Sequence, residues 1–525
     1  MADGSRSSSA TVTRVNPLLR WLMPSAADLI FVAILAALVF TPLSIKLLND
    51  AGIGWHIRTG QLIVATHEIP RVDPFSSQIG KPWVAWEWLY DLIVGRLEAS
   101  AGLNGVVWLT AIVIAATFAA VFRLLIRQGT NLPIAFVLTL LAMSASMIHF
   151  LARPHVLSWL FALVWFWILD SMESSTLQSK RWFWALPVTM LIWGNVHGSF
   201  LLGFVLLASY WLGSAWIWFR LKESRIEEAL ENIAARKRLR DLTIVGLASA
   251  LASLVNPYGW HLHEHIYRYL SNRFLMDHIE EFQSPNFHGI AQRCFLLLLL
   301  TAIAVLVAHG SRFRLSRVLL VLFAVYAALY ASRNIPVSSI LLVLIIGPHV
   351  PSLGLARFTQ RMGAVDAQLR GHLWPVGVGV VVLVIALNGG RAGSQQLMNA
   401  HFDPQRMPVQ AVDFLERTGR RDSFFSPDYW GGYLIYRLYP TNKVVVDDRH
   451  DFYGQDFLTG YMTAIHVEPG WESFVNWRTC AVLPRKAALT AVLSKDLEWK
   501  IVYSDDVATV FQHSEREDSD RGPGD

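Results

Sequence analysis

The sequence is poor in charged residues and in cysteine. Charged side chains make up 16% of its 525 residues, and only two cysteines are present, Cys294 in an apolar run and Cys480 in a polar tail. Soluble globular proteins carry about 25% charged residues, so the composition argues against a water-soluble protein. Neither a disulfide framework nor a cysteine-based metal cluster is indicated. The first residues lack the small-residue cleavage site of a signal peptide, and we expect residues 1–26 to form a disordered cytoplasmic leader.

The sequence is rich in apolar residues, at 53%, and in tryptophan, with 21 residues. A membrane-spanning helix needs about 20 mostly apolar residues. Such runs occur at roughly 28–48, 104–126, 132–150, 156–173, twice in 181–219, and at 241–256, 294–309, 315–332, 335–349 and 373–390. They predict a mainly α, polytopic membrane protein with about 11 transmembrane helices within residues 27–392.

Lysine and arginine set the predicted orientation, because they are enriched in short cytoplasmic loops. With the N-terminus inside, the basic runs 220–241, 311–317 and 356–372 all fall on the cytoplasmic side. The topology is then N-in and C-out, which predicts a multi-pass protein of the bacterial inner membrane whose chain after residue 390 is extracytoplasmic. These loops also account for the net charge of +5, so no nucleic-acid partner is expected.

The predicted outside face carries polar residues at five helix junctions. Asp50 lies there with the candidate substrate-binding residues His56, Arg58, Arg153, His155, His197, Asn256, Arg333 and Asn334. Ionisable groups at the edge of the hydrocarbon are costly and usually functional, whereas the other face carries only solvated charge runs. Any one of these residues, taken alone, could instead cap a helix or mark a turn beside a proline. Their position on one face favours a binding site.

The first outside loop, residues 49–103, is too apolar for an irregular loop. Its first part, residues 55–67, is predicted to form a short helix that ends at a proline-rich turn. The next part places five residues at the spacing of one helical face: Trp83, Trp86, Glu87, Tyr90 and Asp91. The tryptophans suit a helix lying in the membrane interface, beside a lipid-linked substrate. The alternative is that they only anchor the helix.

From residue 397 the composition becomes that of a soluble domain. Helices are predicted at 408–419, 454–465 and 486–496, and strands at 443–449, 479–484 and 499–513. Alternating strands and helices predict an extracytoplasmic α/β domain over residues 397–513. A charged, disordered tail is expected at 514–525.

Candidate acceptor-binding residues lie in two stretches of this domain. They are Asp428, Trp430, Asp447, Asp448, Arg449 and Asp451. The last four lie at the carboxyl end of the strand predicted at 443–449, where the ligands of open α/β sheets gather. The pair Gly431-Gly432 permits close approach of another backbone. The alternative for these acids is an Asp/Arg network that fastens the tail domain to the outside loops.

Several motifs are similar to those of a broad group of bacterial polytopic proteins described as GT-C-like or dolichyl-phosphate-mannose-mannosyltransferase-like. They read D-x-x-x-G-W-H-I-R-T-G-Q, P-R-V-D-P-F-S, W-E-W-L, A-R-P-H, N-P-Y-G-W, S-R-N-I-P and D-D-R-H-D-F-Y-G. An Asp just after the first span, followed by interfacial helices, also resembles the GT-C class of membrane glycosyltransferases. The resemblance covers roughly residues 27 to 510. It implies transfer of a sugar from a polyprenyl-phosphate-type lipid donor to an extracytoplasmic glycan, lipid or protein.

That chemistry needs a base for the acceptor proton and cations for the leaving phosphate. We expect a loop carboxylate, Asp50, to be the base, with Asp73 or Glu87 as a second catalytic carboxylate. The outside arginines and histidines would bind phosphate or sugar. A divalent cation, Mg or Mn, could be held by Asp50, Asp73 and a histidine, although no tight metal-ligand spacing is present and the metal ligands are unknown.

Other functions fit the same topology. A transporter or flippase for lipid-linked glycans is one alternative, but the internal repeats common in transporters are not visible. A polymerase-like or ligase-like handler of such glycans is another. A non-catalytic GT-C-like scaffold is a third, since Gly52 and Gly54 leave the neighbourhood of Asp50 without a second acid.

Overall fold

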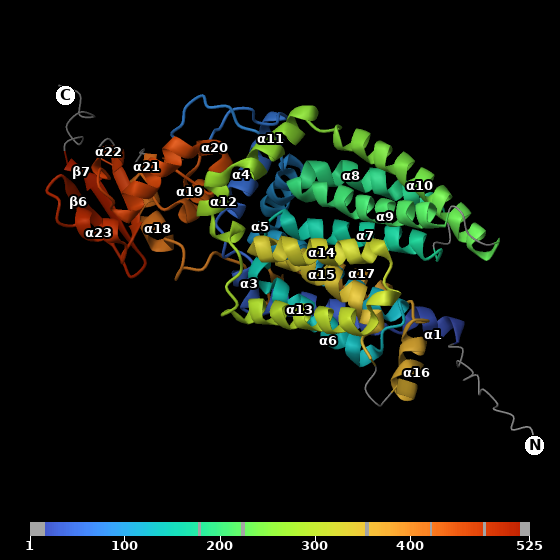
Figure 1. The fold of residues 1–525 in the computed structure, drawn as a ribbon. Helices are drawn as coiled ribbons and strands as arrows, with labels where there is room; N and C mark the ends of the chain where they lie inside the picture. The colour runs from blue at the N-terminus through green and yellow to red at the C-terminus, as the bar shows by residue number, and fades with distance from the viewer. Residues whose placement is uncertain are drawn as a thin grey trace, which may run out of the picture.

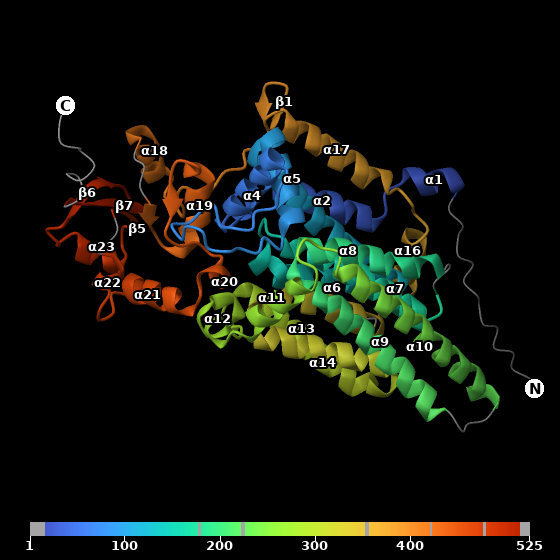
Figure 2. The same ribbon diagram turned by 90° about the horizontal axis from the view of Figure 1, so that it is seen from above.

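The computed structural model describes residues 16–176, 180–221, 226–351, 356–419, 423–475 and 479–514. Within them the chain forms a bundle of long helices with a smaller α/β domain at one end (Figure 1). The bundle helices run roughly side by side, and the C-terminal domain lies at the end opposite the N-terminus in both views (Figure 2).

Each of the predicted apolar segments is helical. The helices are α2 (Ala26–Phe40), α5 (Trp88–Arg127), α6 (Leu132–Ser146), α7 (His155–Glu173), α8 (Ala185–Val196), α9 (Leu201–Arg220), α10 (Ile226–Ser253), α13 (Ile290–His309), α14 (Leu315–Tyr330), α15 (Ile335–Ile346) and α17 (Leu373–Leu387). Six helical stretches of the described chain are long and apolar enough to cross a membrane. The mainly helical, membrane-spanning class is confirmed, whereas a total of eleven spans stays a prediction.

The predicted outside junctions gather at the end of the bundle that meets the C-terminal domain. The short helices α3 (Leu43–Lys46), α4 (Ile53–Thr66), α11 (Trp260–Ser271) and α12 (Arg273–His278) lie there, whereas α1 (Pro17–Leu22) and α16 (Ala356–Asp366) lie at the far end (Figure 1). Which end faces the cytoplasm stays a prediction. The far end is not made of solvated charges alone, because Asp170 is buried at the end of α7 and pairs with Arg317 at 2.9 Å.

Part of the predicted disordered leader is helical. Asn16 accepts a hydrogen bond from the backbone N–H of Leu18 and so caps α1, and Pro17 occupies its first turn, where a proline loses no hydrogen bond. The Arg20 guanidinium donates to Gln368 at 2.7 Å, which fixes α1 to the chain before α17. Residues 1–15 and 515–525, also predicted to be disordered, lie outside the described residues.

The predicted interfacial helix around Trp83 and Trp86 is wrong in its first half. The backbone N–H of Trp83 donates to the Arg71 carbonyl at 2.9 Å, and that of Asp73 donates to Lys81 at 3.1 Å. Residues 71–83 therefore fold back on themselves, and α5 begins only at Trp88. The helix then continues to Arg127 with one break, at Gly102, whose φ is +59°. Periodicity alone did not reveal the backbone pairing that excludes Trp83 from the helix.

The C-terminal domain contains a five-stranded sheet in the order β4 (Lys443–Val444), β3 (Ser423–Phe425), β5 (Cys480–Pro484), β7 (Ala508–His513) and β6 (Trp499–Ser504). β3 runs parallel to β4 and β5, and β7 runs antiparallel to β5 and β6. The predicted helices correspond to α18 (Val409–Thr418), α21 (Gln455–His466) and α23 (Ala488–Leu493). Two further short helices, α19 (Asp428–Leu438) and α20 (His450–Tyr453), follow β3 and β4.

The first loop extends this sheet. The backbone N–H of Val444 donates to the Phe75 carbonyl at 3.1 Å, and that of Ser77 donates back to the Val444 carbonyl at 2.8 Å. Beside this bridge, Arg449 is buried and pairs with Asp73 at 2.7 Å and with Asp447 at 2.6 Å. Backbone pairing and a buried ion pair thus fix the loop of the bundle to the edge of the sheet.

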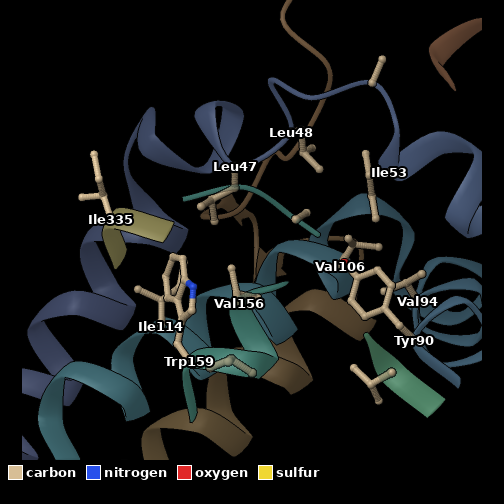
Figure 3. Packing of buried hydrophobic residues seen from close by; sticks show 14 of the residues in the cluster. Leu47, Leu48, Ile53, Tyr90, Val94, Val106, Ile114, Val156, Trp159 and Ile335 are labelled. Carbon is tan, nitrogen blue, oxygen red and sulfur yellow. The ribbon is translucent and has the colours of Figure 1, made fainter. Parts of the chain in front are cut away.

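Glycines let α4 and α19 approach each other. A Cβ atom on Gly432 would lie 2.6 Å from the Ala51 carbonyl carbon and 2.9 Å from the Cα of Gly52, and one on Gly54 would overlap the Gly432 carbonyl. The close approach predicted for Gly431-Gly432 is therefore present, and its partner is the start of α4. Beneath this end lies an apolar core that includes Leu47, Leu48, Ile53, Tyr90, Val94, Val106, Ile114, Val156, Trp159 and Ile335 (Figure 3).

A matched pair of glycine substitutions tests this docking. Gly432 and Gly377 both lie inside helices, but a Cβ on Gly377 meets nothing within 4 Å. Alanine favours a helix interior over glycine by roughly 1 kcal/mol, so Gly377→Ala should leave the apparent unfolding temperature equal or higher. Gly432→Ala should lower it, because overpacking costs about 1–3 kcal/mol. Thermal unfolding of the purified protein in detergent measures both, and equal temperatures for the two variants would contradict the docking.

Candidate active site

A cavity of about 1100 Å³ lies between the end of the bundle and the C-terminal domain. Its bundle side comes from the ends of α2 and α6, the segment around α3, the start of α5 and the turns before α7 and α15. Its other side comes from the starts of α19 and α20. The cavity therefore exists only where the two parts of the chain meet.

Arg153 holds the centre of the polar wall. Its Nε and Nη2 donate to Oδ2 and Oδ1 of Asp50, both at 2.8 Å. Nη2 also donates to Asp448 of the C-terminal domain, whose other oxygen accepts from Trp55 Nε1 at 3.0 Å. Asp50 in addition accepts from the backbone N–H of Gly52 at 2.9 Å. Asp50 is therefore both a turn cap and one of two carboxylates that share a single guanidinium.

Gly52 makes this arrangement sterically feasible. A Cβ atom there would overlap both the Arg153 guanidinium and the Asp448 carboxylate. No second acid stands next to Asp50 in the sequence. Asp448, almost 400 positions further on, is the second carboxylate beside it, and the missing side chain of Gly52 leaves the space that Asp448 occupies.

Glu87 lies deeper on the bundle side and is 8% exposed. Its carboxyl oxygens lie 3.9 Å from His56 Nε2 and 3.7 Å from His197 Nε2. Burial raises the pKa of Glu87 to about 8, even though the charge of Arg153 opposes the shift. At neutral pH this side chain is mainly a neutral acid that can donate a hydrogen bond into the cavity.

His56 contacts Arg153 and is itself held by Asp91 and Trp55. Its Nδ1 lies 2.5 Å from Asp91 Oδ1, and its Nε2 lies 3.5 Å from Arg153 Nη1. Its ring stacks on Trp55 with centroids 3.6 Å apart. Burial, and then the charge of Arg153, lower the pKa of His56 well below its ordinary value, so the ring is neutral at physiological pH.

The C-terminal side carries a second acid–histidine pair. His450 Nε2 lies 2.7 Å from Asp428 Oδ2, and the Tyr461 hydroxyl donates to Asp428 Oδ1 at 3.0 Å. Asp451 lies 3.1 Å from His265 Nε2 of α11. Asp428 follows β3 and His450 follows β4, so both come from the carboxyl ends of neighbouring parallel strands.

The structure brings together ten of the residues predicted from the sequence. Asp50, Glu87, Arg153, His155, His197, Arg333, Asp428, Asp448, Arg449 and Asp451 all line the cavity. Asp73, His56, Arg58, Asn256, Asn334, Trp430 and Asp447 are not among the lining residues.

Most of the predicted residues that do not line the cavity form ion pairs or hydrogen bonds with other segments of the chain. Asp73 and Asp447 flank Arg449, and Arg58 Nε donates to the Tyr436 carbonyl of α19 at 2.7 Å. Trp430 Nε1 donates to the Arg406 carbonyl at 2.8 Å.

The two asparagines are turn and helix-end residues. Asn256 donates to the carbonyls of Ser253 and Gly259 and accepts from the N–H of Tyr258. Asn334 donates to the Ala327 carbonyl at 3.0 Å. Both asparagines therefore make the turn and helix-end contacts that were the alternative to substrate binding.

Sequence reasoning missed several lining residues. They are Lys46, His149, Tyr269, Glu281, Arg406, Tyr429 and His450. His450 stands inside the quoted D-D-R-H-D motif and could have been included on that ground. Lys46 lies four positions before Asp50, one helical turn away, which is the other local signal that was available. The rest reach the cavity through contacts between distant segments.

The predicted cation site is not assembled. Asp50 lines the cavity and Asp73 does not, and in the described part of the chain no group of three or more His, Cys, Asp or Glu side chains is placed to hold a metal ion. Asp50 and Asp73 are therefore not gathered at one site, and a divalent cation stays a prediction.

Comparison with known proteins supports the class of fold. No protein-family model matches the chain, and no curated protein matches it. The oligosaccharyltransferase AglB from Archaeoglobus fulgidus is similar in structure, with a TM-score of 0.52 and 10% identity over 94% of this chain and 74% of AglB. ArnT from Cupriavidus metallidurans in the apo state gives a TM-score of 0.48 at 13% identity over 94% of this chain and 99% of ArnT. The chain is a polytopic membrane protein with a GT-C fold.

The raised pKa of Glu87 makes stability depend on pH. Between its ordinary pKa of 4.5 and about 8, the folded state keeps a proton that the unfolded state has released. Stability from this group is therefore complete below pH 4.5 and is lost as the pH rises through 8, by an amount on the order of a few kcal/mol. Glu87→Gln should flatten the fall in unfolding temperature between pH 6 and 9.

The exposed Glu472 provides the control, because Glu472→Gln should keep the wild-type dependence on pH. Unfolding followed by tryptophan fluorescence at four pH values measures all three proteins. If Glu87→Gln keeps the wild-type slope, Glu87 does not carry the buried proton.

Proposed function

We propose that this protein transfers a sugar from a polyprenyl-phosphate-type lipid to an acceptor hydroxyl, in the cavity between bundle and C-terminal domain, at the outer face of the bacterial inner membrane. The single observation that carries the proposal is the amphipathic cavity, which joins an apolar wall to a cluster of carboxylates and cations. The GT-C fold supports it. The similar AglB structure contains a dolichol-phosphate and an inhibitory peptide, which are molecules of the same chemical kinds as the proposed donor lipid and one class of acceptor.

The apolar wall suits the lipid chain. Its residues are Ile34, Ala37 and Leu38 of α2, Leu43 of α3 and Leu47 directly after it, and Met143, Met147 and Ile148 at the end of α6. A polyprenyl chain placed there would be shielded from water, at about 25 cal/mol for each Å² of apolar surface buried. The wall ends at the polar cluster, so the phosphate of a lipid lying along it would reach the carboxylates and cations.

Lys46 is the cation best placed to receive that phosphate. It lies on α3 within the apolar wall, is exposed, and its side chain has no ion pair or hydrogen bond among the described residues. The arginines first predicted for this role are already engaged, Arg153 by two carboxylates and Arg333 by Glu281 at 3.3 Å. A lysine ammonium binds phosphate as a point charge without needing a fixed geometry.

Asp50 and Asp448 suit the sugar side of the reaction. As the bond between the sugar and the phosphate lengthens, positive charge develops on the sugar ring. Two carboxylates sharing one guanidinium keep a net negative charge, and a fixed negative charge stabilises the developing positive one. Both oxygens of Asp50 accept from Arg153, so the charge of Asp50 is held in a fixed position.

The test is transfer from a panel of radiolabelled polyprenyl-phosphate sugars in membranes that contain wild type or Asp50→Asn. Asparagine keeps the size of Asp50 and can still accept from the Gly52 N–H, but it cannot form the ion pair. We expect transfer by the wild type and a loss of about 100-fold or more in Asp50→Asn, the range seen when an electrostatic group of an active site is removed.

Asp456→Asn is the matched control, since Asp456 is an exposed acid of the same C-terminal domain, in α21. It should transfer at the wild-type rate. Equal transfer by Asp50→Asn at equal protein level would reduce Asp50 to a turn cap. Absence of transfer by the wild type from every donor would overturn the proposed function.

A further inference from the structure

His450 is a histidine of the cavity wall whose orientation is fixed by a carboxylate. It is the first residue of α20 and lies 2.7 Å, through Nε2, from Asp428 Oδ2. Its side chain is 20% exposed, and the residue lines the cavity. No ion pair or hydrogen bond of its Nδ1 is present within the described residues.

Asp428 is itself held in place on its other oxygen. Oδ1 accepts from the Tyr461 hydroxyl at 3.0 Å and from the backbone N–H of Tyr429 at 2.9 Å. The Tyr461 hydroxyl in turn accepts from the N–H of Asp428 at 2.8 Å. These contacts engage Oδ1, and Oδ2 is left for the imidazole of His450.

This arrangement sets the tautomer of the neutral ring. A carboxylate next to Nε2 holds the hydrogen on that nitrogen and leaves the lone pair on Nδ1. An imidazole oriented by a carboxylate, with its other nitrogen open to a cavity, is the arrangement that general-base catalysis requires.

We propose that His450 is the general base that removes the proton from the acceptor hydroxyl, with Asp428 and Tyr461 as its positioning residues. The inference rests on the proposed glycosyl transfer. The acceptor oxygen forms a bond to the anomeric carbon as the bond from that carbon to the lipid phosphate breaks. The phosphate leaves with the electron pair, and the acceptor proton moves to Nδ1 of His450, from which solvent removes it.

The other acids of the cavity are less suited to this step. Both oxygens of Asp50 accept from Arg153, and Asp448 accepts from Arg153 and Trp55. Glu87 is mainly protonated at neutral pH, because burial raises its pKa to about 8. His450 is the lining group that combines a free nitrogen with a partner that stabilises its protonated form.

The charges that raise the pKa of His450 are those of Asp428, Asp448 and Asp447. The other titratable groups on the neighbouring elements are Tyr429 and Tyr461, Arg406 before α18, His265 of α11, and Arg449 and Asp451 of its own segment. Burial lowers the pKa of His450, but the hydrogen bond and charge of Asp428 outweigh burial and raise it above the ordinary value. Transfer should therefore lose rate as the pH falls and His450 becomes protonated.

The experiment is the transfer rate of the full-length protein between pH 5 and 9, measured for wild type, His450→Gln, Asp428→Asn and Asp50→Asn. Wild type should show an acidic limb in which the rate falls with falling pH. His450→Gln should lose about 100-fold or more, the usual contribution of a general base, and should lose the acidic limb. Asp428→Asn, which keeps the histidine and removes its partner, should move the limb to lower pH.

Two further readouts separate catalysis from folding. His450→Ala should regain part of its activity when imidazole is added, which a purely structural loss would not show. Asp50→Asn should be slower than wild type at every pH but keep the position of the limb. These two variants thus separate the base from the electrostatic pair.

The outcomes distinguish this inference from the function on which it rests. Active wild type with a flat pH profile, or His450→Gln that keeps the acidic limb or the wild-type rate, would overturn the role of His450 and leave glycosyl transfer standing. Wild type inactive with every donor would overturn both. If His450→Gln fails to fold, the wild-type pH profile and the Asp428→Asn profile still test the role of His450. An acidic limb that does not move in Asp428→Asn would overturn it.

Discussion

The guanidinium of Arg153 is the contact on which the rest of the site depends. It binds Asp50 from the first loop with two hydrogen bonds and Asp448 from the C-terminal domain with a third, and so joins segments almost 400 positions apart. Leaving a partly buried charge without its partner is destabilising, so each carboxylate helps to keep the other part of the chain in place. Gly52 has no side chain because these two groups occupy the space where one would be.

The segment 447–451 both fastens the C-terminal domain to the first loop and contributes residues to the cavity wall; the sequence presented fastening and acceptor binding as alternatives. Asp447 is buried, pairs with Arg449, and accepts from the Tyr453 hydroxyl at 2.7 Å. Asp448, His450 and Asp451 line the cavity. The fastening network and the chemical groups thus lie on one short stretch, which means that docking of the domain and assembly of the site are the same event. Docking of the domain also brings Asp448 beside Asp50, so a chain with a single acid after its first span still has two carboxylates at this position.

The sequence predicted the elements better than it predicted the site. Apolar runs located the helices, because about 20 apolar residues have few other stable arrangements in a membrane. Short strand-like segments located β4, β5, β6 and β7 of the C-terminal domain, but β3 was not predicted. The start of α5 was predicted wrongly, since the pairing of Trp83 with Arg71 is a contact that no helical period contains. The same limit applies to Asp73, which faces Arg449 and not the cavity. Local pattern decides what an element is, whereas long-range contacts decide which side chains meet.

A structure of the protein in a lipid nanodisc with polyprenyl phosphate bound is the most direct test of the proposed site. We expect the phosphate beside Lys46, the first isoprene units along the wall formed by α2 and α6, and Arg153 close to both Asp50 and Asp448. A phosphate bound at the other end of the bundle, near Arg123 and Arg127 at the end of α5, or a lipid that does not enter the cavity, would contradict it.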